Sequence, residues 1–338
     1  MRPLALTLGE PAGIGPDLAL ALWMRREALG VPPFLLLGDP AYLDARARRL
    51  GLAVNIAESD TGKAKGMFAS ALPVLPLGMK AGAAPGKPDD SSAPIAKAAI
   101  ERAVALVQAS EAAAVVTNPI AKSVMQASGF AFPGHTEFLA HLAVRAGAKP
   151  PLPVMLIWSD ALAVVPVTIH VPLKDVARLL TADLIVETGR IVAREFVRRF
   201  GIARPRLALC GLNPHAGEQG TLGHEDGDVV RPAVDRLKAE GIDASGPWSA
   251  DTLFHADARQ RYDVVLGMYH DQVLIPAKTL AFDRAVNVTL GLSFVRTSPD
   301  HGTAFDLAGS GKANPSSLLA ALKLAVRLAG ADAPIPAR

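Results

Sequence analysis

Cysteine, aromatic residues and net charge are all scarce in this chain of 338 residues. Cys210 is its only cysteine, which excludes a disulfide within the chain and a CxxC zinc site. Aromatic residues make up 5% of the sequence, too few to suggest a base-stacking surface. The net charge is only +3, from 35 basic and 32 acidic residues, so we expect no basic face for nucleic acid.

Long hydrophobic runs are also missing. No stretch of about 18 apolar residues passes without a charge or a helix breaker, so we expect no membrane span. The apolar run near the N-terminus is broken by Gly9, Pro11 and Gly13 and is too short for a signal peptide. We therefore expect a cytoplasmic protein with neither a nucleic-acid nor a membrane partner. Half of the residues are hydrophobic, and a chain of this length suggests roughly two domains.

Short apolar segments alternate with Ala/Leu-rich segments of helical period. Residues 33–39 are typical of a buried strand, whereas residues 93–110 and 175–201 are typical of helices. This alternation predicts an α/β fold with a largely parallel sheet. Residues 152–173 instead suggest a β-hairpin, with Ser159-Asp160 as its turn. No linker marks a domain boundary, which is compatible with a chain that crosses between domains more than once.

Three histidines follow predicted strands. His170 ends AVVPVTIH, His215 follows RLALC after the turn GLNP, and His270 ends VVLGMYH. Ligands of open α/β sheets gather beyond the carboxyl ends of the strands, and neutral imidazole is a common metal ligand. Three protein ligands with one open position are typical of a catalytic metal. The alternative is that each histidine caps a strand or bonds a backbone carbonyl, and the spacing alone leaves both open.

Two segments could bind an anion through the start of a helix. His135 and Thr136 lie in the first turn of a helix predicted over residues 134–142, where Thr136 could also be a plain N-cap. The segment GEPAGIGPD (9–17) has the form strand, glycine loop, helix, which presents backbone N–H groups. It matches neither GxGxxG nor GxxxxGK[ST], so it predicts no Rossmann or P-loop site.

The polar stretch 296–317 has no helical period until its end. Long polar loops in compact domains are usually functional, although an ordinary surface loop is the alternative. Lys278, Asn287 and Arg296 precede or begin this stretch at regular spacing. Together a lysine, an amide and an arginine would suit a phosphate monoester, whereas each alone is more typical of solvated surface.

This stretch carries a resemblance. HGTAFDLAGSGKANP is similar to the HGSAPDIAGKGIANP-type loop that binds the adenosine half of the cofactor in isopropylmalate and isocitrate dehydrogenases. The motifs GEPAGIGPD, TNPIAK, GHTEFLA, LNPHAGEQGTLGHED, YHDQ and RAVNVTLGL-F-RTSPDHGTAFDLAG run from residue 9 to residue 317. In this order they resemble the 4-hydroxythreonine-4-phosphate dehydrogenase family.

The resemblance implies a fold class and a domain organisation. We expect an isocitrate/isopropylmalate dehydrogenase-like fold, with two α/β/α domains and a cleft between them. Residues 1–127 and 281–338 would form the outer domain, which carries the cofactor loop. Residues 128–280 would form the central domain, which carries the metal ligands and the dimer interface.

The resemblance also assigns roles to residues. His170, His215 and His270 match the ligands of one divalent metal per active site, for which zinc, cobalt, magnesium, manganese and nickel are all compatible. Substrate-binding positions match His135, Thr136, Lys278, Asn287 and Arg296. NAD or NADP would contact His301, Gly302, Thr303, Ala304, Asp306 and Asn314. The family is a homodimer with its active site at the interface.

The implied reaction oxidises the C3 hydroxyl of 4-phosphooxy-L-threonine with NAD. Loss of CO2 then gives 3-amino-2-oxopropyl phosphate for pyridoxal phosphate synthesis. A divalent cation held by neutral imidazoles would acidify that hydroxyl and stabilise the alkoxide. Asp251, Asp271 and Lys278 are candidates for catalytic roles such as the base, and either aspartate could instead orient a histidine.

Other functions are compatible with the same residues. A paralogue could oxidise 4-phospho-threonate or 4-phospho-erythronate, which carry the same phosphate and C3 hydroxyl. More remote alternatives are a metal-dependent lyase or a phosphate acyltransferase on a related fold, and a non-catalytic metal- or metabolite-binding protein. NADH production separates the dehydrogenases from the rest.

Overall fold

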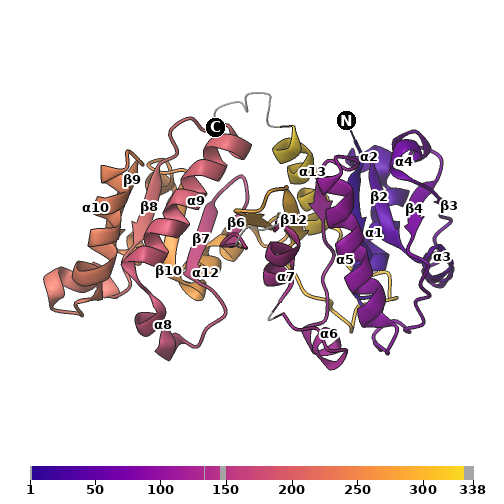
Figure 1. The fold of residues 1–338 in the computed structure, drawn as a ribbon, viewed down its shortest axis with the longest axis horizontal. Coiled ribbons are helices and arrows are strands. Elements are labelled where there is room, and N and C mark those ends of the chain that lie inside the picture. Colours follow the sequence, from indigo (N-terminus) through magenta and orange to yellow (C-terminus); the bar gives the residue numbers. More distant parts are fainter. Residues whose placement is uncertain (1, 133, 145–149, 331–338) are drawn as a thin grey trace. The chain divides into compact units, whose positions relative to one another are not determined.

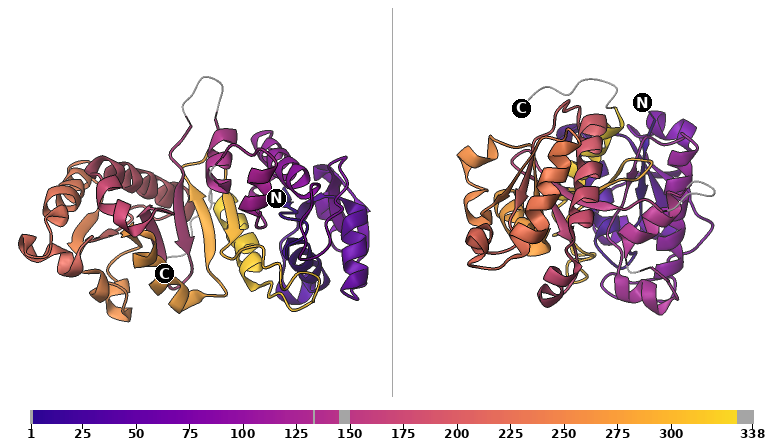
Figure 2. Two further views of the ribbon diagram at one scale, coloured as in Figure 1. Left: turned by 90° about the horizontal axis from the view of Figure 1, so that it is seen from below. Right: turned by 60° about the vertical axis from the view of Figure 1, so that its left-hand side comes forward.

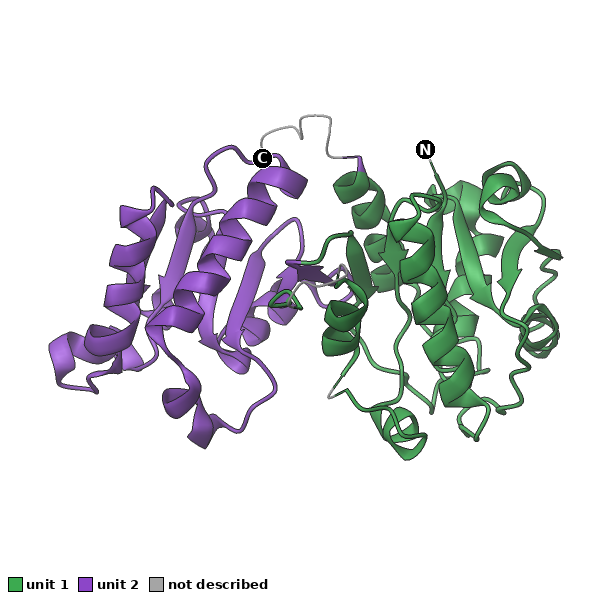
Figure 3. Ribbon diagram, viewed as in Figure 1, with its two compact units in different colours: residues 1–153, 292–329 green, residues 154–291, 330–338 purple. Residues whose placement is uncertain are grey.

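The structure is a computed structural model that describes residues 2–132, 134–144 and 150–330 (Figure 1). The chain forms two compact units (Figure 3). Unit 1 consists of Met1–Pro153 and Leu292–Ala329, and unit 2 consists of Val154–Gly291 with Gly330–Arg338. The chain therefore crosses between the units more than once, which is compatible with the absence of a linker in the sequence.

Unit 1 contains a parallel sheet in the order β3-β4-β2-β1-β5-β12. Its strands β1 and β2 are buried throughout and, apart from Thr7, apolar, as expected where helices cover both faces of a parallel sheet. The strands are β1 (Leu4–Thr7), β2 (Phe34–Gly38), β3 (Ile56–Glu58), β4 (Leu72–Pro76), β5 (Val115–Val116) and β12 (Arg296–Pro299). The helices are α1 (Gly15–Met24), α2 (Arg26–Leu29), α3 (Pro40–Arg49), α4 (Thr61–Met67), α5 (Ser92–Gln108), α6 (Lys122–Ala127), α7 (His135–Leu142) and α13 (Ser316–Ala329).

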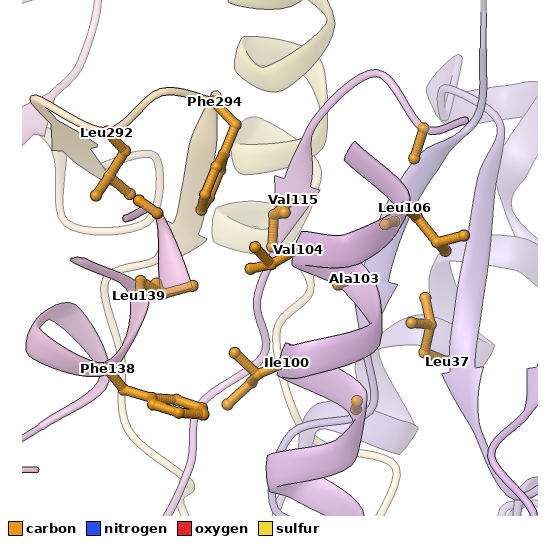
Figure 4. Close-up of a cluster of buried hydrophobic side chains, with 14 of the residues drawn as sticks. Leu37, Ile100, Ala103, Val104, Leu106, Val115, Phe138, Leu139, Leu292 and Phe294 are labelled. Carbon is orange, nitrogen blue, oxygen red and sulfur yellow. The ribbon is translucent and has the colours of Figure 1, made fainter. Parts of the chain in front are cut away.

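The core of unit 1 joins segments that are distant in the sequence. Helix α5 contributes Ile100 and Val104, and α7 contributes Phe138 to the same cluster (Figure 4). Leu292 and Phe294, just before β12, complete it from the returning part of the chain. Removal of this much apolar surface from water holds the two parts of unit 1 together.

Unit 2 contains a mixed sheet in the order β11-β6-β7-β10-β8-β9. Strand β6 is antiparallel to both of its neighbours, and the rest of the described pairs are parallel. The strands are β6 (Val154–Trp158), β7 (Ala163–Thr168), β8 (Leu207–Cys210), β9 (Ala244–Trp248), β10 (Val264–Tyr269) and β11 (Val286–Leu290). The helices are α8 (Leu173–Leu179), α9 (Ala182–Phe200), α10 (Arg231–Ala239), α11 (Ala256–Arg259) and α12 (His270–Ala281).

The elements confirm several expectations. Strands β6 and β7 form the predicted hairpin across Ser159-Asp160, and helices pack on both sheets (Figure 2). Residues 175–201 form two helices, α8 and α9, because Thr181 is the N-cap of α9. Its side chain accepts a hydrogen bond from Leu184 N. None of the helices in the described ranges combines the length and the apolar character that crossing a membrane needs.

The limits of the compact units differ from the predicted domain boundaries. The prediction separates the domains at 127/128 and 280/281, whereas the units separate at 153/154 and 291/292. Residues 128–153 group with unit 1, where α7 packs against α5. Residues 281–291 group with unit 2 because β11 pairs antiparallel with β6.

Gly15 opens α1 at a point with no room for a side chain. A Cβ atom there would lie 2.5 Å from the Leu8 carbonyl oxygen and 3.0 Å from the Asn118 Cβ. We expect Gly15→Ala to lower the free energy of unfolding by about 1–3 kcal/mol, measured by urea denaturation, because backbone must move. In the control Gly66→Ala, within α4, a Cβ meets nothing within 4 Å, and stability should rise by about 0.5–1 kcal/mol. Equal changes in the two variants would contradict the packing argument.

Candidate active site

The three candidate metal-ligating histidines follow adjacent parallel strands of unit 2. Strand β10 pairs with β7 on one side and with β8 on the other. His170 lies two residues beyond β7, His270 begins α12 directly after β10, and His215 lies in the loop after β8. The rings of His170 and His270 have their centroids 5.4 Å apart. The shared sheet edge predicted from the sequence is therefore present.

His215 lies in an unusual turn. All five residues from 215 to 219 have positive φ, although only Gly217 among them is glycine. Left-handed backbone is costly for other residues, and such strain is typical of functional sites. The buried carboxylate of Asp226 accepts hydrogen bonds from Leu212 N at 2.6 Å and Asn213 N at 3.0 Å, which holds the start of this loop.

The imidazoles do not form a closed metal site in this structure. Within the described ranges, no three His, Cys, Asp or Glu side chains converge closely enough to hold a metal ion. His215 Nδ1 instead lies 3.8 Å from Glu218 Oε2. The donor set nevertheless suits a divalent transition metal, because three imidazoles lie at neighbouring strand ends and imidazole is a common ligand of such metals.

The candidate catalytic residues of unit 2 surround these strand ends. Asp271 Oδ1 lies 2.6 Å from His270 Nδ1, a hydrogen bond that suits a carboxylate orienting an imidazole. The hydrogen bond from Ser249 Oγ, and more weakly the nearby His215, lower the pKa of Asp251. Lys278 is half-buried on α12, eight residues after His270.

Unit 1 holds a second set of polar residues at strand ends. Arg296, the first residue of β12, is 4% exposed and donates from Nε and Nη2 to Thr117 Oγ1, at 3.2 and 2.8 Å. Burial lowers the pKa of Arg296 to about 10, which leaves the guanidinium charged at neutral pH. A buried guanidinium suits an anionic group such as a phosphate.

His135 lies beside this guanidinium at the start of α7. Burial, and then the charge of Arg296, lower the pKa of His135 well below its ordinary value of 6.5. Its Nε2 is shielded from solvent and has no hydrogen-bond partner among the described residues. The imidazole is therefore neutral and available to a ligand. Thr136, the next residue, is half-buried.

The predicted substrate-binding residues are divided between the units. His135, Thr136 and Arg296 belong to unit 1, where His135 and Arg296 interact. Lys278 and Asn287 belong to unit 2, on α12 and β11.

The predicted cofactor loop follows β12 in unit 1. Residues 300–315 have almost no regular structure, and Ile14 N donates to Thr303 O at 3.0 Å. Gly309 N donates to Asp17 Oδ2 at 2.6 Å. The loop thus rests on the segment after β1, beyond the carboxyl ends of parallel strands, where open α/β sheets bind dinucleotides. His301, Gly302, Thr303, Ala304, Asp306 and Asn314 all lie on it.

Several residues of these sites give no sign of their role in the sequence. Thr117, in the motif TNPIAK, is the acceptor for Arg296. Asp17 and Asp226 each end a longer motif, GEPAGIGPD and LNPHAGEQGTLGHED, and nothing in either motif marks the carboxylate. Arg46 lies in an arginine-rich segment that gives no sign of burial.

The lowered pKa of His135 predicts a pH dependence of stability. Below pH 6.5 the unfolded chain binds a proton at this position that the folded chain does not, so stability falls as the pH falls from about 7. The slope from this group approaches 1.4 kcal/mol per pH unit. Urea denaturation at several pH values measures it. His135→Gln cannot titrate and should remove this part of the slope, whereas an unchanged slope would contradict the assignment.

The fold of the two units and the polar residues at their strand ends are those of a class, the dehydrogenases with an isocitrate/isopropylmalate dehydrogenase-like fold. A family model described as "Pyridoxal phosphate biosynthetic protein PdxA" matches residues 31–325, and the chain belongs to this family. The chain is thus an oxidoreductase among the dehydrogenases of pyridoxal phosphate biosynthesis.

Relatives agree with this family. The chain is 66% identical to a 4-hydroxythreonine-4-phosphate dehydrogenase of Xanthobacter autotrophicus, over 99% of this chain and 96% of the relative. A protein of the same name from Methylorubrum populi is 61% identical, over 100% and 98% of the two chains. The crystal structure of the Klebsiella pneumoniae 4-hydroxythreonine-4-phosphate dehydrogenase has a TM-score of 0.85 at 34% identity and covers 97% of this chain and 100% of its own. The family resemblance and the fold class are therefore confirmed.

Proposed function

We propose that this enzyme oxidises the C3 hydroxyl of 4-phosphooxy-L-threonine with NAD or NADP, and that loss of CO2 then gives 3-amino-2-oxopropyl phosphate. The observation that carries the proposal is the buried, charged Arg296 beside a neutral His135. A substrate phosphate is the anion that this pair would bind. The names of the close relatives specify the same phosphorylated substrate.

The phosphate end of the substrate is held by charge and by hydrogen bonds. Arg296, oriented by Thr117 Oγ1, supplies the charge, and His135 and Thr136 supply ring and hydroxyl groups at the start of α7. Lys278 and Asn287 are proposed as further substrate contacts. Binding energy at the phosphate, remote from C3, positions the reacting carbon.

The reacting end of the substrate is assigned to unit 2. His170, His215 and His270 would hold one divalent ion, of zinc, cobalt, magnesium, manganese or nickel, with movement of the His215 loop. When bound, such an ion lowers the pKa of an alcohol and stabilises negative charge on its oxygen. Asp271 keeps the His270 ring oriented through its hydrogen bond. Asp251, Asp271 and Lys278 are the groups proposed to accept the hydroxyl proton.

The cofactor is assigned to the loop after β12. His301, Gly302, Thr303, Ala304, Asp306 and Asn314 would contact its adenosine half. A Cβ at Gly302 would meet nothing within 4 Å, so the loop is open at this point. The polar and partly exposed loop thus suits a nicotinamide cofactor.

We also propose a homodimer that acts in the cytoplasm. Large apolar side chains are exposed on unit 2: Leu173 is 71% exposed, Ile275 65% and Phe282 74%. Exposed apolar groups of this size are typical of interaction surfaces. Sedimentation velocity measures the state, and a monomer at micromolar concentration would contradict it.

The test of the reaction is the appearance of NADH or NADPH with purified, metal-reconstituted enzyme. 4-Phosphooxy-L-threonine, 4-phospho-threonate and 4-phospho-D-erythronate are offered side by side, and mass spectrometry follows the decarboxylated product. Reduction with the amino substrate alone supports the proposal. Reduction only with a sugar acid would assign the chain to a paralogue, and no reduction with any of them would contradict the proposal.

A further inference from the structure

Two buried charges lie beneath the loop after β12. Asp17 on α1 and Arg46 on α3 are each only 3% exposed. Arg46 Nη1 pairs with Asp17 Oδ1 and also donates to Gly13 O at 3.2 Å. Arg46 Nη2 donates to Pro11 O at 2.8 Å and to the Tyr42 hydroxyl at 2.7 Å. The guanidinium thereby holds the glycine-rich segment 9–17 in one conformation.

The same carboxylate also reaches the loop after β12. Asp17 Oδ2 accepts the hydrogen bond from Gly309 N at 2.6 Å, and Gly309 has a φ of +70°. The Asp17 carboxylate therefore connects two loops. It reaches the segment 9–17 through Arg46, and it binds the loop after β12 directly through Gly309 N. The bond from Ile14 N to Thr303 O is a second connection between these loops.

Stability alone does not account for such a pair. Removing two charges from water costs several kcal/mol per ion before the ions attract each other, and well-packed apolar residues often stabilise a protein as well. What apolar residues cannot supply is an acceptor for Gly309 N together with donors for Pro11 O and Gly13 O. The Asp17–Arg46 pair therefore specifies the conformation of the segment 9–17 and of the loop after β12.

We propose that the Asp17–Arg46 pair is a positioning element for the nicotinamide cofactor. It holds residues 300–311 in the conformation that binds the adenosine half before the cofactor arrives. Neither residue is assigned to the reaction. The inference rests on the proposed function in one respect, namely that this loop binds the cofactor.

The decisive variant is Asp17→Asn, which keeps the size of the side chain and removes its charge. If residues 300–311 of this variant hold the binding conformation in about one molecule in ten, the apparent Kd for the cofactor is roughly tenfold higher than in the wild type. We therefore expect the Kd for NAD, or for NADP if the wild type prefers it, to rise roughly tenfold in isothermal titration calorimetry. Hydrogen exchange of peptides that cover residues 300–311 should accelerate without any cofactor present.

A matched control exists in unit 2. Glu195 and Arg199 form another buried ion pair, with Arg199 Nε 2.5 Å from Glu195 Oε2, on α9. Glu195→Gln removes the same kind of charge in the unit that does not carry the cofactor loop. We expect it to lower Tm, as Asp17→Asn does, but to leave both the cofactor Kd and the exchange of residues 300–311 unchanged.

A second variant covers the case in which Asp17→Asn does not fold. Tyr42→Phe removes one acceptor of Arg46 and one of the two donors to Pro11 O, and a smaller rise in Kd, roughly threefold, is expected. If the folded variants bind the cofactor as the wild type does, with unchanged loop exchange, the inference is wrong while the proposed function stands. A wild type that binds neither NAD nor NADP would overturn the proposed function, and the cofactor role of the pair with it.

Discussion

Arg296→Met should raise the KM for the phosphorylated substrate by about two orders of magnitude. Arg296 is 4% exposed and already oriented by Thr117, so it meets an anion with little further loss of freedom. Loss of one partner of a buried, hydrogen-bonded charge pair costs about 2–5 kcal/mol, roughly 30-fold to several thousandfold in binding. Methionine fills a similar volume, which separates loss of charge from loss of packing. Steady-state kinetics over a range of substrate concentrations measures the change.

The kinetic pattern distinguishes binding from chemistry. Because Arg296 is proposed to contact the phosphate, the KM for NAD should remain close to that of the wild type. Arg206→Met is a suitable control, since the Arg206 guanidinium is likewise held by another side chain, here the carboxylate of Asp263, but lies exposed in unit 2. An unchanged KM for the phosphorylated substrate in Arg296→Met would contradict the phosphate assignment.

His215→Ala should abolish both metal binding and catalysis. A bound metal contributes several kcal/mol to stabilising charge on the reacting oxygen, so the loss in kcat/KM should be roughly a thousandfold or more. Metal content, measured by inductively coupled plasma mass spectrometry after reconstitution, should fall in parallel. His170→Ala and His270→Ala should behave alike, because a site with three protein ligands depends on each of them.

The control for the histidine series is His255→Ala. His255 is exposed at the start of α11 and does not follow any of the three strands β7, β8 and β10. Its removal should leave the metal content and kcat/KM close to the wild-type values. Full metal content in His215→Ala would remove His215 from the proposed site and leave the strained turn at residues 215–219 unexplained.

Local pattern in the sequence was sufficient to predict the fold class. Buried strands of a parallel sheet appear as short apolar runs, so the alternation of runs with helical segments predicted the α/β architecture. The β6–β7 hairpin was visible because two apolar runs flank the polar pair Ser159-Asp160. The shared edge of His170, His215 and His270 followed from strand ends alone, since parallel strands bring their carboxyl ends to one side.

The unit boundaries and the conformation of the His215 loop could not be predicted in this way. Whether α7 joins one unit or the other depends on how Phe138 packs against α5, which is a contact between distant segments. The turn at residues 215–219 has one glycine in five residues, so its left-handed backbone has no local signal.

The fold class, the family and the chemical type of the residues at each strand end could be predicted without a structure, because they depend on residue identity and order. Which charges are buried depends on tertiary packing and could not be predicted. Arg46 and Arg48 are alike in the sequence, yet Arg46 is 3% exposed and pairs with Asp17 whereas the Arg48 side chain is 70% exposed. Burial depends on which distant segments pack over a side chain, and burial determines whether a charge orders a loop, binds an anion or is simply solvated.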